Sequence, residues 1–332
     1  MTPPRLFLVH GPTPIVRRPA LDEIVGAEVW VKRDDATGGA ESGNKVRKLE
    51  FLLADAIAKG AKTVVTCGGI QSNHARATAL TCAALGLRAV LLLRVKDPAA
   101  ARKAPIDLRG NVLLDALAGA EIRYVSHDEY RDRSAIMEQV RVELGDAYVV
   151  PEGGSNGLGS LGYVEAMRET RRQIDLGLAG EARPFDVVAH ACGSGGTAAG
   201  VALGAARFGV AKETWAFAVC DDRAYFDKTI ARIARESRAL DPSLPELTGL
   251  VVDDRSKGPA YGVMNDEQKR FLAEVARRTG LVLDPVYTGK AMHGLAEAVR
   301  RGAITKGARV LFLHTGGLPG LLAQGEDLRS AL

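Results

Sequence analysis

The 332-residue chain has only four cysteines, and none of them forms a Cys-x-x-Cys pair. Paired cysteines are the commonest sign of a zinc site, so this scarcity leads us to expect no metal. Cys67, Cys192 and Cys220 each lie at or near the end of an apolar run, which favours buried, reduced thiols.

Long hydrophobic runs are also missing. No apolar run approaches the ~20 residues of a membrane span, and the N-terminus lacks the apolar core of a signal peptide. We therefore expect no membrane partner and a cytoplasmic location. The net charge is only +4, and basic residues are scattered among acids without interleaved aromatics, so we expect no nucleic-acid partner.

Short apolar and β-branched runs alternate with helical stretches along most of the chain. We expect helices at 74–85 and 134–144, and strands at 63–67, 89–93, 121–125, 148–150, 186–189, 215–219, 249–252 and 310–313. This alternation predicts an α/β fold with largely parallel sheets covered on both faces. About nine strands exceed one open sheet, so we expect two three-layer domains.

Four glycine clusters follow predicted strands: Gly68-Gly69, Gly153-Gly154, the loop at 193–197 and Gly316-Gly317. Parallel sheets bind ligands beyond the carboxyl ends of their strands. Glycine there permits tight turns and close approach of backbone N–H groups. Any one cluster could be a simple turn, but four together indicate a ligand site.

The loop at 193–197 is the best candidate for a phosphate cradle. It consists of Gly193, Ser194, Gly195, Gly196 and Thr197, and it precedes a stretch rich in alanine and glycine. Backbone amides and two hydroxyls can hold a dianion there. No Gly-Lys-Ser/Thr follows, which excludes a Walker A loop. The spacing also fits a loose dinucleotide fingerprint with Asp221 beyond the next strand, so a nicotinamide-dependent oxidoreductase is an alternative.

Lys45 follows a Gly43-Asn44 turn at the start of a helical stretch with an apolar stripe. The positive end of the helix dipole disfavours an ammonium and helps to lower the lysine pKa. A lysine with a lowered pKa can form a Schiff base with a carbonyl cofactor. The alternative is a solvated lysine beside a basic turn.

Other candidates have both structural and chemical interpretations. In Gln71-Ser72-Asn73-His74, Ser72 or Asn73 can cap a helix or help to bind a substrate carboxylate, and His74 can be a helix-turn histidine or a catalyst. Two more candidates are aromatic: Tyr261 and Tyr287. Each can be a core aromatic, or can transfer a proton if a nearby cation lowers the phenol pKa.

Together these segments resemble the fold-type II pyridoxal-phosphate enzymes, and among them the D-cysteine desulfhydrase/1-aminocyclopropane-1-carboxylate (ACC) deaminase family. The similarity extends over nearly the whole chain. Its most specific parts are the Gly-Asn-Lys-Val-Arg-Lys-Leu-Glu string at 43–50 and the Gln-Ser-Asn string at 71–73. The resemblance implies a tryptophan synthase β-subunit-like fold and a homodimer. It places a small domain at 48–160, a large domain at 1–47 plus 161–332, and the active site in the cleft between them.

The resemblance also implies roles for individual residues. Lys45 would be the Schiff-base lysine, with Asn44 and Lys48 helping to hold pyridoxal 5'-phosphate. Ser72 would meet the substrate carboxylate or attack, and Asn73 would bond the cofactor ring hydroxyl, with Gln71 and His74 near the substrate. The loop at 193–197 would bind the phosphate, and Tyr261 and Tyr287 would flank the substrate.

Two positions favour the desulfhydrase branch. Deaminases of the family carry Glu and Leu where this chain has Thr288 and Thr315, and the resemblance implies that Thr288 bonds the ring nitrogen. The expected reaction is α,β-elimination from a small amino acid, D-cysteine above all. Close alternatives are an L-cysteate sulfo-lyase, an ACC deaminase, or elimination from another β-substituted alanine, and a non-catalytic cofactor-binding protein is a further alternative.

Overall fold

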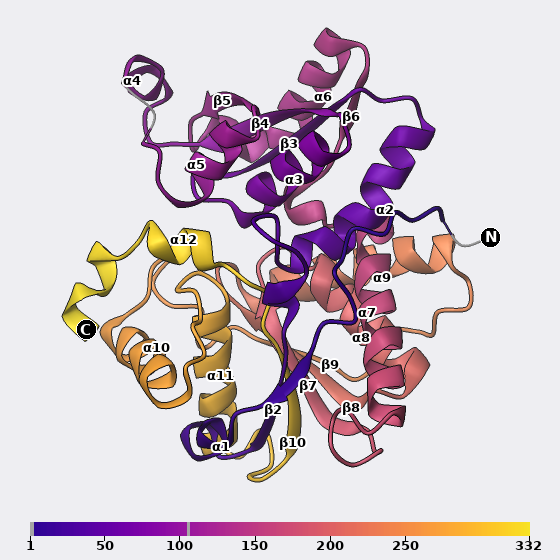
Figure 1. The fold of residues 1–332 in the computed structure, drawn as a ribbon, viewed down its shortest axis with the longest axis vertical. Coiled ribbons are helices and arrows are strands. Elements are labelled where there is room, and N and C mark those ends of the chain that lie inside the picture. Colours follow the sequence, from indigo (N-terminus) through magenta and orange to yellow (C-terminus); the bar gives the residue numbers. More distant parts are fainter. Residues whose placement is uncertain (1–2, 105–106) are drawn as a thin grey trace.

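The computed structural model describes residues 3–104 and 107–332, which form two sheets with helices on both faces (Figure 1). The larger sheet has the strand order β1-β2-β10-β7-β8-β9, and only the β1–β2 pair is antiparallel. Its strands are β1 (Ile15–Arg17), β2 (Glu28–Lys32), β7 (Phe185–Cys192), β8 (Ala211–Ala218), β9 (Leu250–Asp253) and β10 (Arg309–Leu313).

The smaller sheet is parallel throughout, with the order β5-β4-β3-β6. Its strands are β3 (Thr63–Gly69), β4 (Arg88–Arg94), β5 (Glu121–Val125) and β6 (Ala147–Val149). Adjacent residues of a strand point to opposite faces. Val64 therefore packs with α2 and α3 on one face, and Val65 packs with α6 on the other. Because both faces are buried, β4 is apolar at consecutive positions.

Helices cover the two sheets as the alternating pattern predicts. On the larger sheet, one face packs against α1 (Pro19–Val25), α10 (Asp266–Thr279) and α11 (Thr288–Arg300), and the other against α7 (Gly157–Asp175), α8 (Gly196–Phe208) and α9 (Arg223–Leu240). The smaller sheet packs against α2 (Asn44–Ala58), α3 (Asn73–Ala84) and α6 (Arg133–Leu144), while α5 (Gly110–Leu117) lies on α3. The remaining helical segments are α4 (Pro98–Lys103), α12 (Leu318–Leu322), η1 (Asp34–Ala36), η2 (Glu129–Asp132), η3 (Glu152–Gly154) and η4 (Glu326–Ala331).

The predicted α/β fold with two sheets is confirmed, and every predicted strand and helix is found within a few residues of its expected place. The strands of the smaller sheet all fall within residues 63–149. Both predicted domain boundaries lie inside helices, after residue 47 in α2 and after residue 160 in α7. The division by residue number therefore stays a prediction.

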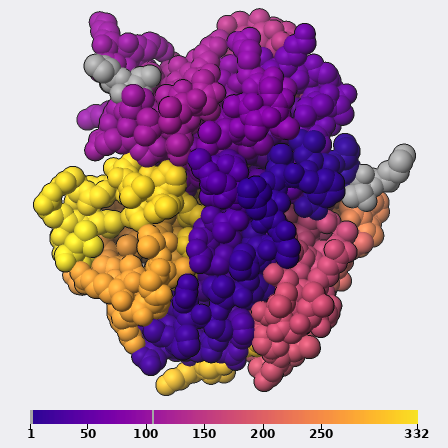
Figure 2. All heavy atoms as spheres, viewed as in Figure 1, coloured from indigo at the N-terminus to yellow at the C-terminus, as the bar shows by residue number. Residues whose placement is uncertain are grey.

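The N-terminal segment connects the two parts of the molecule. In the space-filling view, the N-terminal segment (indigo) runs from the junction between the upper and lower parts down over the lower part (Figure 2). Over residues 3–104 and 107–332, no helix has both the length and the apolar character that crossing a bilayer would require.

A buried ionic cluster fixes the start of α2. The Arg47 guanidinium donates to both carboxylate oxygens of Asp34 at 2.8 Å, and also to Glu169 of α7 at 3.0 Å. Lys32 donates to the same Glu169 oxygen at 2.5 Å, and the Tyr163 hydroxyl donates to Asp34 at 2.8 Å. Burial would raise the pKa of Asp34, but the charge and hydrogen bonds of Arg47 outweigh it and lower that pKa to about 2. The cluster thus joins β2, α2 and α7.

Replacing Arg47 by Met is expected to lower the free energy of unfolding by about 3–5 kcal/mol, because the buried Asp34 carboxylate loses its cation. Urea denaturation followed by circular dichroism would measure the change. Arg141→Met, which removes an exposed ion pair with Glu138 on α6, is the matched control and is expected to change stability little. Equal effects of the two substitutions would contradict the prediction.

Candidate functional site

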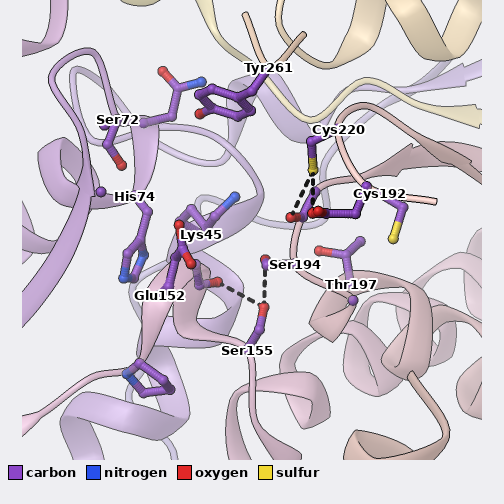
Figure 3. Close-up of a pocket in the computed structure, with 18 of the residues that line it drawn as sticks. Lys45, Ser72, His74, Glu152, Ser155, Cys192, Ser194, Thr197, Cys220 and Tyr261 are labelled. Carbon is purple, nitrogen blue, oxygen red and sulfur yellow. Dashed lines mark hydrogen bonds between the residues drawn. The ribbon is translucent and has the colours of Figure 1, made fainter. Parts of the chain in front are cut away.

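One cavity of about 730 Å³ lies beyond the carboxyl ends of strands from both sheets. All four glycine clusters contribute to its wall, through Gly68, Gly153, Gly193 and Gly316 among others. The prediction that these clusters form a ligand site, and are not only four separate turns, is therefore supported by their meeting at one place. The close-up shows side chains from both parts of the chain around this cavity (Figure 3).

Lys45 and the glycine loop lie in the same cavity and are joined through one amide. The Lys45 Nζ donates to Asn44 Oδ1 at 2.9 Å, and the Asn44 Nδ2 donates to Thr197 Oγ1 at 3.2 Å. Asn44 and Lys45 are the first two residues of α2, while Thr197 is in the first turn of α8. The lysine side chain points between Ser72 and Tyr261 on one side and Ser194 on the other (Figure 3).

The Lys45 amine is poised to lose its proton. Burial, together with the nearby Arg76 guanidinium, lowers its pKa to about 8, and Asp284 partly opposes these two effects. Sequence reasoning attributed the lowered pKa to the helix dipole, whereas the structure identifies desolvation as the main cause. A substantial fraction of this amine is therefore neutral near pH 8.

Lys48, one turn along α2, is held differently. Its Nζ donates to Gly153 O at 3.0 Å and to Ser155 Oγ at 3.1 Å, and its side chain is almost fully buried. Ser155 Oγ in turn lies 2.8 Å from Ser194 Oγ of the glycine loop. These contacts commit the Lys48 amine to the segment after β6, which in turn contacts the glycine loop. Lys45 is therefore the better placed of the two amines for a carbonyl ligand.

The glycine loop has the shape of an anion cradle. Gly195 adopts a φ of +82° and precedes α8, whose first backbone N–H groups face the loop. A Cβ on Gly193 would lie 2.9 Å from Tyr287 Cε1, and one on Gly196 would lie 2.6 Å from Ser155 Oγ. Side chains at these two positions would close the loop against its neighbours, so the glycines keep it open.

The 71–74 segment divides between structural and cavity positions. Ser72 caps α3 by accepting from Ala75 N at 3.2 Å, and it also lines the cavity. Asn73 and His74 line the cavity too, and burial lowers the pKa of His74 well below its usual value, so this imidazole is neutral. Gln71, predicted near the substrate, instead bonds Arg109 O and Asn111 N beside α5 and does not line the cavity. Its turn directs the side chain toward α5.

The two tyrosines form a hydrogen-bonded pair at the cavity wall. Their hydroxyls lie 2.6 Å apart, and Lys45 Nζ lies 5.7 Å from the Tyr287 ring centroid. Desolvation raises the pKa of Tyr261 to about 12, although 37% of its surface is accessible, and it raises the pKa of Tyr287 well above its usual value. The phenol pKa is thus not lowered by a cation, as sequence reasoning considered, and both phenols are protonated.

The threonine predicted to bond the ring nitrogen lies elsewhere. Thr288 Oγ1 donates to Asp284 Oδ1 at 2.7 Å and accepts from Asp284 N, so it fastens the start of α11 and does not line the cavity. Thr315, immediately after His314 at the end of β10, does line it. Of the two threonines, Thr315 is the one available to a ligand.

Sequence reasoning missed several cavity residues. Ser155 follows the Gly153-Gly154 cluster, and its position just beyond a predicted strand was the available signal. Arg94 comes from the end of β4, with its guanidinium 4.9 Å from the Tyr130 ring centroid and 5.9 Å from that of Tyr261. Glu152 also faces the cavity but is engaged by Arg133 at 2.8 Å and by the Tyr130 hydroxyl at 2.6 Å.

These residues fit the cofactor that the sequence implies. Pyridoxal phosphate needs an amine for its aldehyde and an anion cradle for its phosphate, and here Lys45 and the glycine loop share one cavity. Thr315 and the tyrosine pair line the same cavity.

Comparison with known proteins agrees with this geometry. A relative from Arabidopsis thaliana, named bifunctional D-cysteine desulfhydrase/1-aminocyclopropane-1-carboxylate deaminase, mitochondrial, is 41% identical over 98% of this chain and 81% of its own length. The D-cysteine desulfhydrase of Serratia proteamaculans is 39% identical over 96% of both chains. A putative ACC deaminase of Thermotoga maritima is 42% identical over 98% of this chain and 99% of its own.

Solved structures show the same fold. The crystal structure of an ACC deaminase homologue superposes with a TM-score of 0.85 at 36% identity, covering 99% of this chain and 97% of that one. Maize serine racemase, at 18% identity and a TM-score of 0.66 over 96% of this chain and 92% of its own, shares the fold. The family model described as pyridoxal-phosphate dependent enzyme matches residues 6–316. The chain therefore belongs to the pyridoxal-phosphate dependent enzymes and uses that cofactor in place of a nicotinamide.

Proposed function

We propose that this enzyme catalyses α,β-elimination from a small amino acid, with D-cysteine as the substrate and pyruvate, sulfide and ammonia as the products. The observation that carries the proposal is the placing of the Lys45 amine and the glycine loop in one cavity, joined through Asn44. The names of the Arabidopsis and Serratia relatives support this substrate.

The substrate carboxylate is bound at the start of α3. Ser72 and Asn73 line the cavity where the first N–H groups of that helix are directed, and a helix N-terminus favours an anion. Asn111 donates to Asn73 Oδ1 at 3.0 Å and fixes that amide. This arrangement orients the amino acid toward Lys45.

Proton transfer is assigned to Lys45 and the tyrosine pair. When bound, pyridoxal phosphate withdraws electrons from the amino acid and makes its α-hydrogen acidic. Nζ of Lys45, with its pKa near 8, accepts that proton. Tyr261 or Tyr287, both protonated, donates to the departing sulfur as the Cβ–S bond breaks. Water then releases the remaining product as pyruvate and ammonia.

Thr315 is assigned the contact with the pyridine nitrogen in place of Thr288. Its hydroxyl is at the cavity wall and carries no charge, so it can bond a neutral ring nitrogen. A neutral ring suffices for expelling a good leaving group such as a thiol, which favours elimination over opening of a cyclopropane. A homodimer in the cytoplasm and the two-domain boundaries given above are part of this proposal.

A second candidate substrate class is favoured by Arg94. Its guanidinium lies against two aromatic rings at the cavity wall, and within the described part of the chain no carboxylate lies within 4.0 Å of it. Stacking of this kind leaves the N–H edge of the guanidinium available for bidentate binding of an anion. An amino acid with a second anionic group, such as L-cysteate, would place its sulfonate there and release sulfite.

Lys45→Ala is expected to abolish covalent attachment of the cofactor, because the protein loses the amine that reacts with the aldehyde. Borohydride reduction followed by mass spectrometry would locate the attachment. Lys48→Met is the matched control, since that amine is committed to Gly153 and Ser155; attachment should persist with weaker cofactor affinity. Attachment at Lys48 in the wild-type protein would refute the assignment.

Cofactor capture by the cofactor-free protein is expected to accelerate about tenfold per pH unit below pH 7 and to level off above pH 8. Only the neutral amine attacks an aldehyde, and the pKa of Lys45 is about 8, so the neutral fraction saturates above that pH. Stopped-flow absorbance across pH 6–10.5 would measure it. A rate that still rises steeply at pH 10 would indicate an unperturbed lysine.

Arg94→Gln is expected to reduce kcat/KM for L-cysteate at least tenfold while changing that for D-cysteine less than threefold, because only the former has a second anion. Sulfide, sulfite and ammonia release from a panel including ACC would be measured in parallel. Lys96→Gln, an exposed cation two residues further on, serves as control. Equal losses on both substrates would remove Arg94 from substrate discrimination, and ammonia released from ACC alone would make the enzyme a deaminase.

A further inference from the structure

A second polar cluster lies between α10 and α11, and none of its members lines the cofactor cavity. It consists of Glu267 in the first turn of α10, and His293 and Glu297 on α11. His293 is only 5% exposed, and neither of its ring nitrogens has a hydrogen-bond partner among residues 3–104 and 107–332. An unpaired buried imidazole is costly, which calls for an explanation.

The distances between the His293 ring nitrogen and the two carboxylates are too long for hydrogen bonds and suit coordination of a shared metal ion. His293 Nε2 lies 3.7 Å from Glu267 Oε1 and 3.9 Å from Glu297 Oε1, and the three atoms all lie within 4.8 Å of one another. Two ligands at ~2.0–2.1 Å from a tetrahedral Zn²⁺ are themselves about 3.3 Å apart. The two distances to His293 Nε2 exceed this value by about half an ångström, and the two carboxylate oxygens lie within 4.8 Å of each other.

The helices hold these ligands in place. His293 and Glu297 are four residues apart, so they lie on the same face of α11. The Phe271 ring stands edge-on to the His293 ring, with centroids 5.3 Å apart and an interplanar angle of 88°. Asn265 and Gln268 form a capping box that fixes the turn carrying Glu267. Only Glu267 is largely exposed, so it can complete the site by a change of rotamer.

We propose that Glu267, His293 and Glu297 bind one divalent cation of the zinc class, with solvent completing the coordination. One imidazole with two carboxylates suits Zn²⁺ better than Ca²⁺ or Mg²⁺, which prefer oxygen ligands alone. Arg300 pairs with Glu297 and is the competing cation, but 63% of its side chain is exposed and it can turn into solvent. The ion links α10 to α11, the helix whose first turn follows Tyr287. The site departs from the expectation of no metal, which rested on cysteine spacing.

Isothermal titration of the holoenzyme with ZnCl₂ tests the proposal. The wild-type chain should bind one Zn²⁺, and both Glu267→Gln and His293→Gln should weaken that binding at least tenfold. Glu267→Gln is the safer variant because its side chain is 61% exposed and its loss leaves the core intact. Binding of Zn²⁺ at Cys192 and Cys220, which line the cofactor cavity, would instead persist in both variants and would overturn the proposal.

Glu274→Gln, on the same helix, removes an ion pair with Arg278; it is the control and should bind Zn²⁺ as the wild type does. Zn²⁺ should also raise the melting temperature of the wild type and of Glu274→Gln, but not that of Glu267→Gln. Absence of saturable binding, or wild-type affinity in either Glu267→Gln or His293→Gln, would overturn the proposal.

Discussion

The ion pair between Arg47 and Asp34 is the constraint on which the site depends. Arg47 lies two residues after Lys45, and its guanidinium is buried against the carboxylate of Asp34, which follows β2. A guanidinium held by two bonds to one carboxylate permits neither rotation nor sliding of its helix without leaving both charges unpaired. The direction in which the Lys45 amine leaves α2 is therefore set by charges outside the cavity.

The same helix supplies the electrostatic character of the cavity. Lys45 and Lys48 lie one turn apart, and each is desolvated, so each favours the neutral amine. Their environments nevertheless differ: Lys48 donates to two oxygens of neighbouring loops, whereas Lys45 donates to one amide that reaches the glycine loop. The Lys48 amine is thus held by its two hydrogen bonds, and the Lys45 amine remains available for chemistry.

The sequence predicted the fold because its signals were local or repeated. Buried parallel strands are continuous apolar runs, and glycine clusters at strand ends meet wherever such strands are parallel. Side-chain direction at the turns could not be predicted in the same way. Gln71 and Ser72 are adjacent in the turn that leads into α3, yet their side chains point in different directions. The Gln71 side chain accepts a hydrogen bond from Asn111 N of α5, whereas the Ser72 side chain lines the cavity. Thr288 likewise lies at a helix start, where its hydroxyl bonds Asp284. Arg94 and Ser155 could not be assigned, because their partners are distant in sequence.

A close approach of two helices has a consequence for how this protein can vary. A Cβ on Gly162 of α7 would lie only 2.1 Å from Arg47 O, so the backbones of α2 and α7 touch at that point. Even a methyl group would push α2 outward and carry the reactive nitrogen with it. Glycine at position 162 therefore sets how closely α2 packs against α7. Substitutions in the cavity wall can change which amino acid the enzyme accepts, whereas position 162 must remain glycine.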